Sequence, residues 1–143
     1  MTTTSQPGLS TGWANSNGLL RLVLRIDAVG SGALGLALLA GAGILPGVLG
    51  TPVALLLPVG FFLLAYAASL WFLASRSQVA TNAVRAVIGL NLLWAVDSVL
   101  LVTLGWFPLT APGTAVVLVQ GVAVLLFADL QFLGLRRANR AAG

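Results

Sequence analysis

The sequence predicts an all-α fold: a four-helix transmembrane bundle that forms one domain. Of its 143 residues, 59% are hydrophobic and only 7% are charged, whereas soluble domains contain about 25% charged residues. Four apolar stretches are each long enough to cross a bilayer as a helix, which takes roughly 20 residues. Short polar or turn-rich segments separate them. All seven basic residues fall on one side if the four helices alternate in direction.

The first predicted element is a polar, uncharged segment at residues 1–18. We expect a disordered cytoplasmic tail there, because the segment has few apolar residues to bury. The first membrane span is predicted over about residues 19–44. Small residues recur in it at every fourth position, and such spacing lets helix backbones approach closely in lipid. The sets are Ala28 with Gly32, Ser31 with Gly35, and Ala33 with Ala37 and Gly41.

The second span is predicted over about residues 52–74. Pro52 suits the start of a helix, and Pro58 lies in its first turns. The span is rich in aromatic side chains, which either line an apolar ligand groove or, as the simpler interpretation, provide packing and lipid contact. These side chains are Phe61, Phe62, Tyr66, Trp71 and Phe72, with Trp94 from the third span.

The third and fourth spans are predicted over about residues 83–106 and 113–135, with an uncharged, proline-containing turn between them. A short cytoplasmic tail is expected at residues 138–143. No other stretch is long enough to form a separate soluble domain. Residues 19–137 are therefore predicted to be a single transmembrane domain.

The arginines predict the orientation of the bundle. Two lie at the start of the first span, two flank the connector between the second and third spans, and three follow the fourth span. They are Arg21, Arg25, Arg76, Arg85, Arg136, Arg137 and Arg140. The positive-inside rule then places both termini and that connector in the cytoplasm. The sequence therefore predicts a multi-pass protein of the inner (plasma) membrane.

Two pairs of similar short segments, one pair 70 residues apart and the other 60, suggest an internal repeat. The segment Asp27–Gly35 resembles Asp97–Gly105, and residues 69–76 resemble residues 129–136. Two interpretations stay open. One is a two-plus-two repeat, in which two helix pairs are related by an axis along the membrane normal. The other is chance similarity among the Leu, Gly and Ala that dominate the composition.

The missing residue types exclude several functions. The sequence contains no His, Cys, Lys or Glu. It therefore lacks the ligands of common zinc and iron–sulfur sites, the parts of a Ser–His–Asp or Cys–His catalytic unit, and a lysine for a Schiff base. We expect no cofactor, no metal site and no enzymatic activity. The net charge of +4 comes from arginines beside apolar segments, which indicates lipid headgroup contact rather than nucleic-acid binding.

A set of polar residues at similar predicted depth is the first candidate site. Arg25 and Asp27 belong to the first span, Asn91 to the third, and Asp129 and Gln131 to the fourth. Folding could join them in one buried network. The network is either an interhelical ion pair that fixes helix register, or a cavity that binds a polar headgroup or relays a proton.

Asp97 is the second candidate, because it lies deepest in a predicted span and has no arginine at its depth. A carboxylate at the bilayer centre costs about 2.5–3.5 kcal/mol on insertion scales. It either takes up and releases a proton, as a small proton-coupled carrier requires, or forms a plain hydrogen bond. The expected partners for such a bond are Gln120, Ser98 and Thr103.

The glycines of the first span form a literal GxGxxG, at Gly30, Gly32 and Gly35. A dinucleotide-binding fingerprint requires a preceding strand and an acidic residue about 20 positions further on. The sequence near position 55 is apolar. We therefore interpret these glycines as helix-packing residues.

Three motifs resemble a type of small four-span integral membrane protein, uncharacterised and common in GC-rich bacteria. They are LRIDAVGSGALG at residues 24–35, NLLWAVDS at residues 91–98 and FADLQFLGLRR at residues 127–137. The resemblance covers about residues 19–137. In size and topology the chain is also similar, more loosely, to the DoxX-like membrane proteins. The more specific positions are Arg25, Asp27, Asn91, Trp94 and Gln131.

We expect a non-enzymatic protein of the bacterial inner membrane that acts as an accessory or scaffold component, or binds a lipid-like ligand. Its partners would be membrane lipids and either another membrane protein or a second copy of the chain. The alternative is a small proton-coupled transporter that works as a homodimer. Asp97 would then titrate, and Arg25, Asp27 and Asp129 would form gate or substrate contacts.

Overall fold

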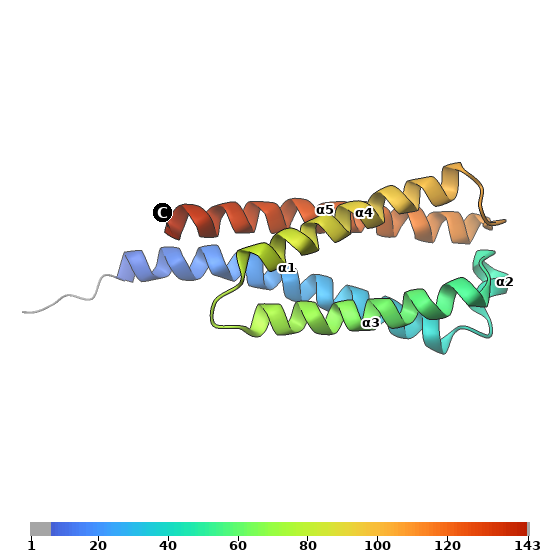
Figure 1. Cartoon of the computed structure of the whole chain (residues 1–143), viewed down its shortest axis with the longest axis horizontal. Coiled ribbons are helices and arrows are strands. Elements are labelled where there is room, and N and C mark those ends of the chain that lie inside the picture. The colour runs from blue at the N-terminus through green and yellow to red at the C-terminus, as the bar shows by residue number, and fades with distance from the viewer. Residues whose placement is uncertain (1–6, 143) are drawn as a thin grey trace, which may run out of the picture.

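A computed structural model describes the backbone of residues 7–142 and the side chains of residues 18–141. All of its regular elements are helices (Figure 1). They are α1 (Pro7–Ala40), α2 (Leu45–Leu49), α3 (Val53–Ser75), α4 (Thr81–Thr103) and α5 (Ala111–Ala142). The four long helices contain segments that are apolar and long enough to cross a membrane. The predicted all-α class and the four-helix bundle are confirmed.

The ends of the helices differ from the prediction at three places. The first span stops at Ala40 rather than near residue 44, because residues 41–44 form a turn that leads into the short helix α2. Helix α1 begins at Pro7, within the segment predicted to be a tail, and residues 1–6 lie outside the described part. At the other end, α5 continues through most of the predicted tail. A packed helix extends readily into flanking residues because propagation is easier than nucleation.

The bundle consists of two antiparallel helix pairs. Helix α1 packs on α3, α4 packs on α5, and extensive contacts between α1 and α5 join the pairs. The beginning of α1, the α3–α4 connector and the end of α5 lie at one end of the bundle, which we call the arginine end (Figure 1). Helix α2 and the α4–α5 turn lie at the other end, toward which α4 runs away from α3.

Glycines allow the closest helix contacts. A Cβ atom added at Gly35 of α1 would lie 2.9 Å from the carbonyl oxygen of Gly60 in α3, and one at Gly60 would meet the Leu39 side chain at 2.8 Å. A Cβ atom at Gly134 of α5 would lie 3.1 Å from the Cα of Leu20 in α1. Gly35 is part of the GxGxxG, and this contact fits the helix-packing interpretation for Gly35, whereas a Cβ atom at Gly30 would meet nothing within 4 Å.

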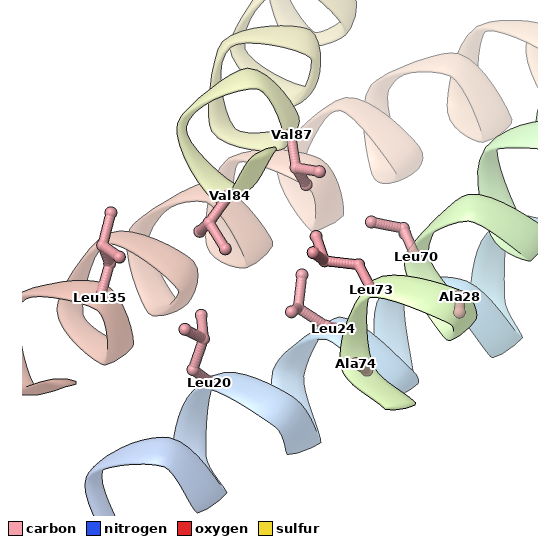
Figure 2. Packing of buried hydrophobic residues seen from close by; sticks show 9 residues of the cluster. All are labelled: Leu20, Leu24, Ala28, Leu70, Leu73, Ala74, Val84, Val87 and Leu135. Atoms are coloured by element: carbon pink, nitrogen blue, oxygen red, sulfur yellow. The ribbon is translucent and has the colours of Figure 1, made fainter. Parts of the chain in front are cut away.

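A buried apolar cluster closes the arginine end of the bundle. Its members come from all four long helices and face a common interior, as Figure 2 shows. They are Leu20, Leu24, Ala28, Leu70, Leu73, Ala74, Val84, Val87 and Leu135. Nearby, the Arg21 side chain donates a hydrogen bond of 2.6 Å to the carbonyl of Ser77 and so ties α1 to the α3–α4 connector.

A leucine at Gly35 should force α1 and α3 apart, since its Cβ atom alone would crowd Gly60 and Leu63. We expect the free energy of unfolding in detergent to fall by roughly 1–3 kcal/mol, the usual effect of overpacking. Gly89→Leu is the matched control, because a Cβ atom there meets nothing within 4 Å. Equal losses of thermal stability in the two variants would contradict the close α1–α3 contact.

Candidate functional site

The candidate site is built around the carboxylate of Asp27, which is fully buried in α1. Gln131 Nε2 donates to Asp27 Oδ2 at 2.8 Å, and Asn91 Nδ2 donates to the same oxygen at 3.1 Å. The Ser31 hydroxyl, one turn further along α1, donates to Oδ1 at 3.1 Å. Each contact brings a donor to a carboxyl oxygen, so the Asp27 side chain is the common acceptor of three donors.

The donors also bond to one another. Asn91 Nδ2 donates a second hydrogen bond, of 3.0 Å, to Gln131 Oε1. The Tyr66 hydroxyl lies 2.9 Å from Asn91 Oδ1 and 3.4 Å from Asp27 Oδ2. Its single proton serves one acceptor at a time, and the shorter distance favours Asn91. We call Asp27, Ser31, Tyr66, Asn91 and Gln131 the Asp27 cluster.

The Asp27 cluster links all four long helices. Asp27 comes from α1, Tyr66 from α3, Asn91 from α4 and Gln131 from α5. Asn91 and Gln131 are almost completely buried, as is Asp27. A buried polar group that loses its partner destabilises a protein by about 1–3 kcal/mol, so the cluster favours the one helix arrangement in which every group is bonded.

Arg25 is not part of the network around Asp27, although the two were grouped by their similar depth. Arg25 is exposed, and its guanidinium carbon lies 5.5 Å from the centre of the Trp71 ring, a cation–π contact between α1 and α3. The partners of Asp27 are neutral amides and hydroxyls. Two residues separate the side chains by about 200° around a helix of 3.6 residues per turn, so Arg25 cannot share the inward face of Asp27.

Asp129 also lies outside the network in which it was expected. It is exposed on α5, whereas Gln131 is buried. The same geometry applies, because two residues along a helix point to nearly opposite sides. Of the residues predicted to lie at similar depth, Asn91 and Gln131 therefore contact Asp27, whereas Asp129 does not.

Asp97 has a different environment from the one predicted. It is exposed on α4, and none of its three expected partners bonds to it. Ser98 and Thr103 donate to carbonyls of their own helix, at 2.8 Å in both cases. Gln120 of α5 instead accepts a hydrogen bond of 3.1 Å from Trp94 Nε1.

Two cavities lie where α3 and α4 diverge, with volumes of about 520 and 390 Å³. They adjoin, because Leu34, Trp94, Asp97 and Gln120 line both. The larger reaches the Asp27 cluster through Ser31, Tyr66 and Asn91. The smaller extends toward the end opposite the arginines, where Leu49, Trp106 and Phe107 are among its lining residues.

A row of three aromatic rings bridges α3 and α4 beside the larger cavity. The Phe62 ring stacks on Tyr66 at 6.0 Å and on Trp94 at 5.9 Å between centroids. The row has a polar group at each end, since the Tyr66 hydroxyl reaches the Asp27 cluster and Trp94 reaches Gln120. This row links the cluster to the surroundings of Asp97.

Two members of the site, Tyr66 and Ser31, were not predicted from the sequence. Tyr66 was assigned to the aromatic face of its helix, and Ser31 to a small-residue packing face. One signal was available for Ser31, because it follows Asp27 by four residues and therefore lies on the same helix face. Tyr66 is the sole tyrosine of the chain, and a hydroxyl inside an apolar span requires a partner.

Comparison of the chain with protein-family models, with curated proteins and with solved structures gives no match. The fold and the apolar helices define the class: a multi-pass helical membrane protein with four candidate spans. The resemblance to uncharacterised four-span proteins of GC-rich bacteria, and more loosely to DoxX-like proteins, stays a prediction.

Replacing Asp27 with alanine should remove the common acceptor of Ser31, Asn91 and Gln131, and lower the free energy of unfolding by roughly 2 kcal/mol or more. Asp27→Asn should lower it less, because the amide oxygen can take the place of Oδ2 while its NH₂ group donates to the Ser31 hydroxyl. Denaturation in mixed detergent micelles measures both.

Asp129→Ala is the control for this comparison, because Asp129 is exposed outside the cluster. Its stability should match that of the unchanged protein. A loss as large in Asp27→Asn as in Asp27→Ala would contradict the acceptor role and would assign the effect to the charge itself.

Proposed function

We propose that the protein binds a lipid-like ligand in the two adjoining cavities, inside the bacterial inner membrane. The observation that supports this most is the opening between α3 and α4, together with its lining. Phe62, Leu90 and Leu93 line the larger cavity and are exposed on the surface of the bundle. In a bilayer that surface faces lipid, so a ligand would enter sideways from the membrane.

The chemistry of the lining favours an apolar molecule with a small polar part. Small-molecule sites are mostly apolar and contain a few placed polar groups. Here the apolar lining is extensive, and the polar groups that reach it include Asp97, Gln120 and Tyr66. The Asp27 cluster would have a structural role in this proposal, because its groups are bonded to one another.

The proposal includes no catalytic step and no cofactor. A second candidate is the proton-coupled transporter with Asp97 as its titrating group, favoured by the position of Asp97 between the two cavities. Arg25 and Asp129 do not support it, because both are exposed and neither lines a cavity. For a transporter, Asp97→Asn would abolish coupled flux without changing the amount of protein in the membrane.

Filling the larger cavity should prevent ligand entry. We expect Ala123→Phe, which adds a ring to the lining, to abolish saturable quenching of Trp94 by bromine-terminated undecanol in phosphatidylcholine nanodiscs. The measurement uses a protein with Trp94 as its sole tryptophan, since Trp94 lines both cavities. The other tryptophans, Trp13, Trp71 and Trp106, are changed to phenylalanine.

Ala115→Phe is the matched control, because Ala115 is exposed on α5 and lines neither cavity. It should leave the quenching unchanged. If undecanol does not quench Trp94 in a saturable way, or if both phenylalanine variants behave alike, the binding function is wrong.

The orientation in the membrane is part of the proposal, with the arginine end in the cytoplasm. The chain has no cysteine, so single cysteines report topology directly. Gly43→Cys, in the uncharged turn after α1, should react with a membrane-impermeant maleimide in intact spheroplasts. Ser77→Cys, in the α3–α4 connector, should react only after lysis. The reverse pattern would place the termini outside.

A further inference from the structure

Asp97 is the only charged side chain that lines either cavity within the described residues. It lies where the two cavities adjoin and belongs to the lining of both. None of the seven arginines lines a cavity. Asp97 is therefore the one acidic group of the lining, and no basic side chain of the lining can pair with it.

The polar neighbours of Asp97 are engaged elsewhere. The Gln120 side-chain oxygen accepts from Trp94, and the Ser98 hydroxyl donates to the Trp94 carbonyl. A carboxylate at this depth, facing an apolar space, is costly unless it meets a cation, a proton or water. The contrast with Asp27, whose oxygens are surrounded by donors, indicates that Asp97 is not part of the internal framework.

We propose that the cavities bind a single-chain amphiphile with a cationic amine, whose ammonium group pairs with Asp97. This inference rests on the proposed lipid-like ligand and specifies its charge. The apolar chain would lie along the lining between α3 and α4, and the ammonium group would lie at the junction of the cavities. An anionic chain of equal length would be repelled there, because the low dielectric of the surrounding lipid strengthens the interaction between charges.

The test compares three bromine-terminated undecyl chains that differ only in their end group: ammonium, hydroxyl and carboxylate. Each is titrated into phosphatidylcholine nanodiscs that hold the protein with Trp94 as its sole tryptophan, and the quenching curve gives an apparent Kd. The same titrations are made with Asp97→Asn and with Asp129→Asn. Asp129 is the matched control, since it is exposed and lines no cavity.

We expect the ammonium chain to bind at least tenfold more tightly than the hydroxyl chain, and the carboxylate chain to bind most weakly. Asp97→Asn should weaken ammonium binding about tenfold and leave hydroxyl binding unchanged, while Asp129→Asn should change neither. If Asp97→Asn does not alter ammonium binding while all chains still bind, the proposed charge preference is wrong. The proposed binding of a lipid-like ligand is then still supported. If no chain binds, the proposed function itself fails.

A second copy of the chain could also contact the exposed side chain of Asp97. The oligomeric state of the same variants, purified in detergent, is therefore measured by native mass spectrometry. If Asp97→Asn converts a dimer into a monomer, Asp97 serves a subunit contact, and that result overturns the ammonium site. An unchanged oligomeric state, together with the expected Kd pattern, supports it.

Discussion

The buried carboxylate of Asp27 is the constraint on which the rest of the bundle depends. Apolar packing alone does not select one arrangement of helices in lipid, because lipid tails are as apolar as leucine side chains. Asp27 favours one arrangement of the helices, since its oxygens accept all three hydrogen bonds only when Ser31, Asn91 and Gln131 lie around it. The α4 and α5 donors must then lie at one depth and one rotation relative to α1.

This constraint also explains where the bundle opens. The glycine contact at Gly35 and Gly60 holds α1 against α3, and the cluster draws α4 and α5 toward α1 at the depth of Asp27. Beyond that depth, little joins α3 to α4 except the row of rings through Phe62. The cavities lie where α3 and α4 diverge, and Asp97 is among the lining residues of both. Asp27 thus holds the four helices together, whereas Asp97 lines the cavities and, in our proposal, pairs with a ligand.

Much of the fold could be predicted from the sequence, because span length and the scarcity of charge in apolar stretches are local properties. The site was predicted only in part. Asn91 and Gln131 were expected to meet Asp27 from their depth, but depth says nothing about rotation around a helix axis. For that reason Arg25 and Asp129 were wrongly included in the network. Asp97 was expected to titrate or to form a hydrogen bond with Gln120, Ser98 or Thr103, but in the folded bundle it is exposed and lines the cavities without bonding to these residues.

The role of the Asp27 cluster is tested most directly by the exchange of the side-chain amide protons of Asn91 and Gln131 with water, measured by NMR in nanodiscs. If both amides donate to the buried carboxylate of Asp27, their protons should exchange orders of magnitude more slowly than those of an exposed amide such as Gln78. Exchange as fast as that of Gln78 would mean that the cluster is open to water, and would contradict its role in holding the four helices together.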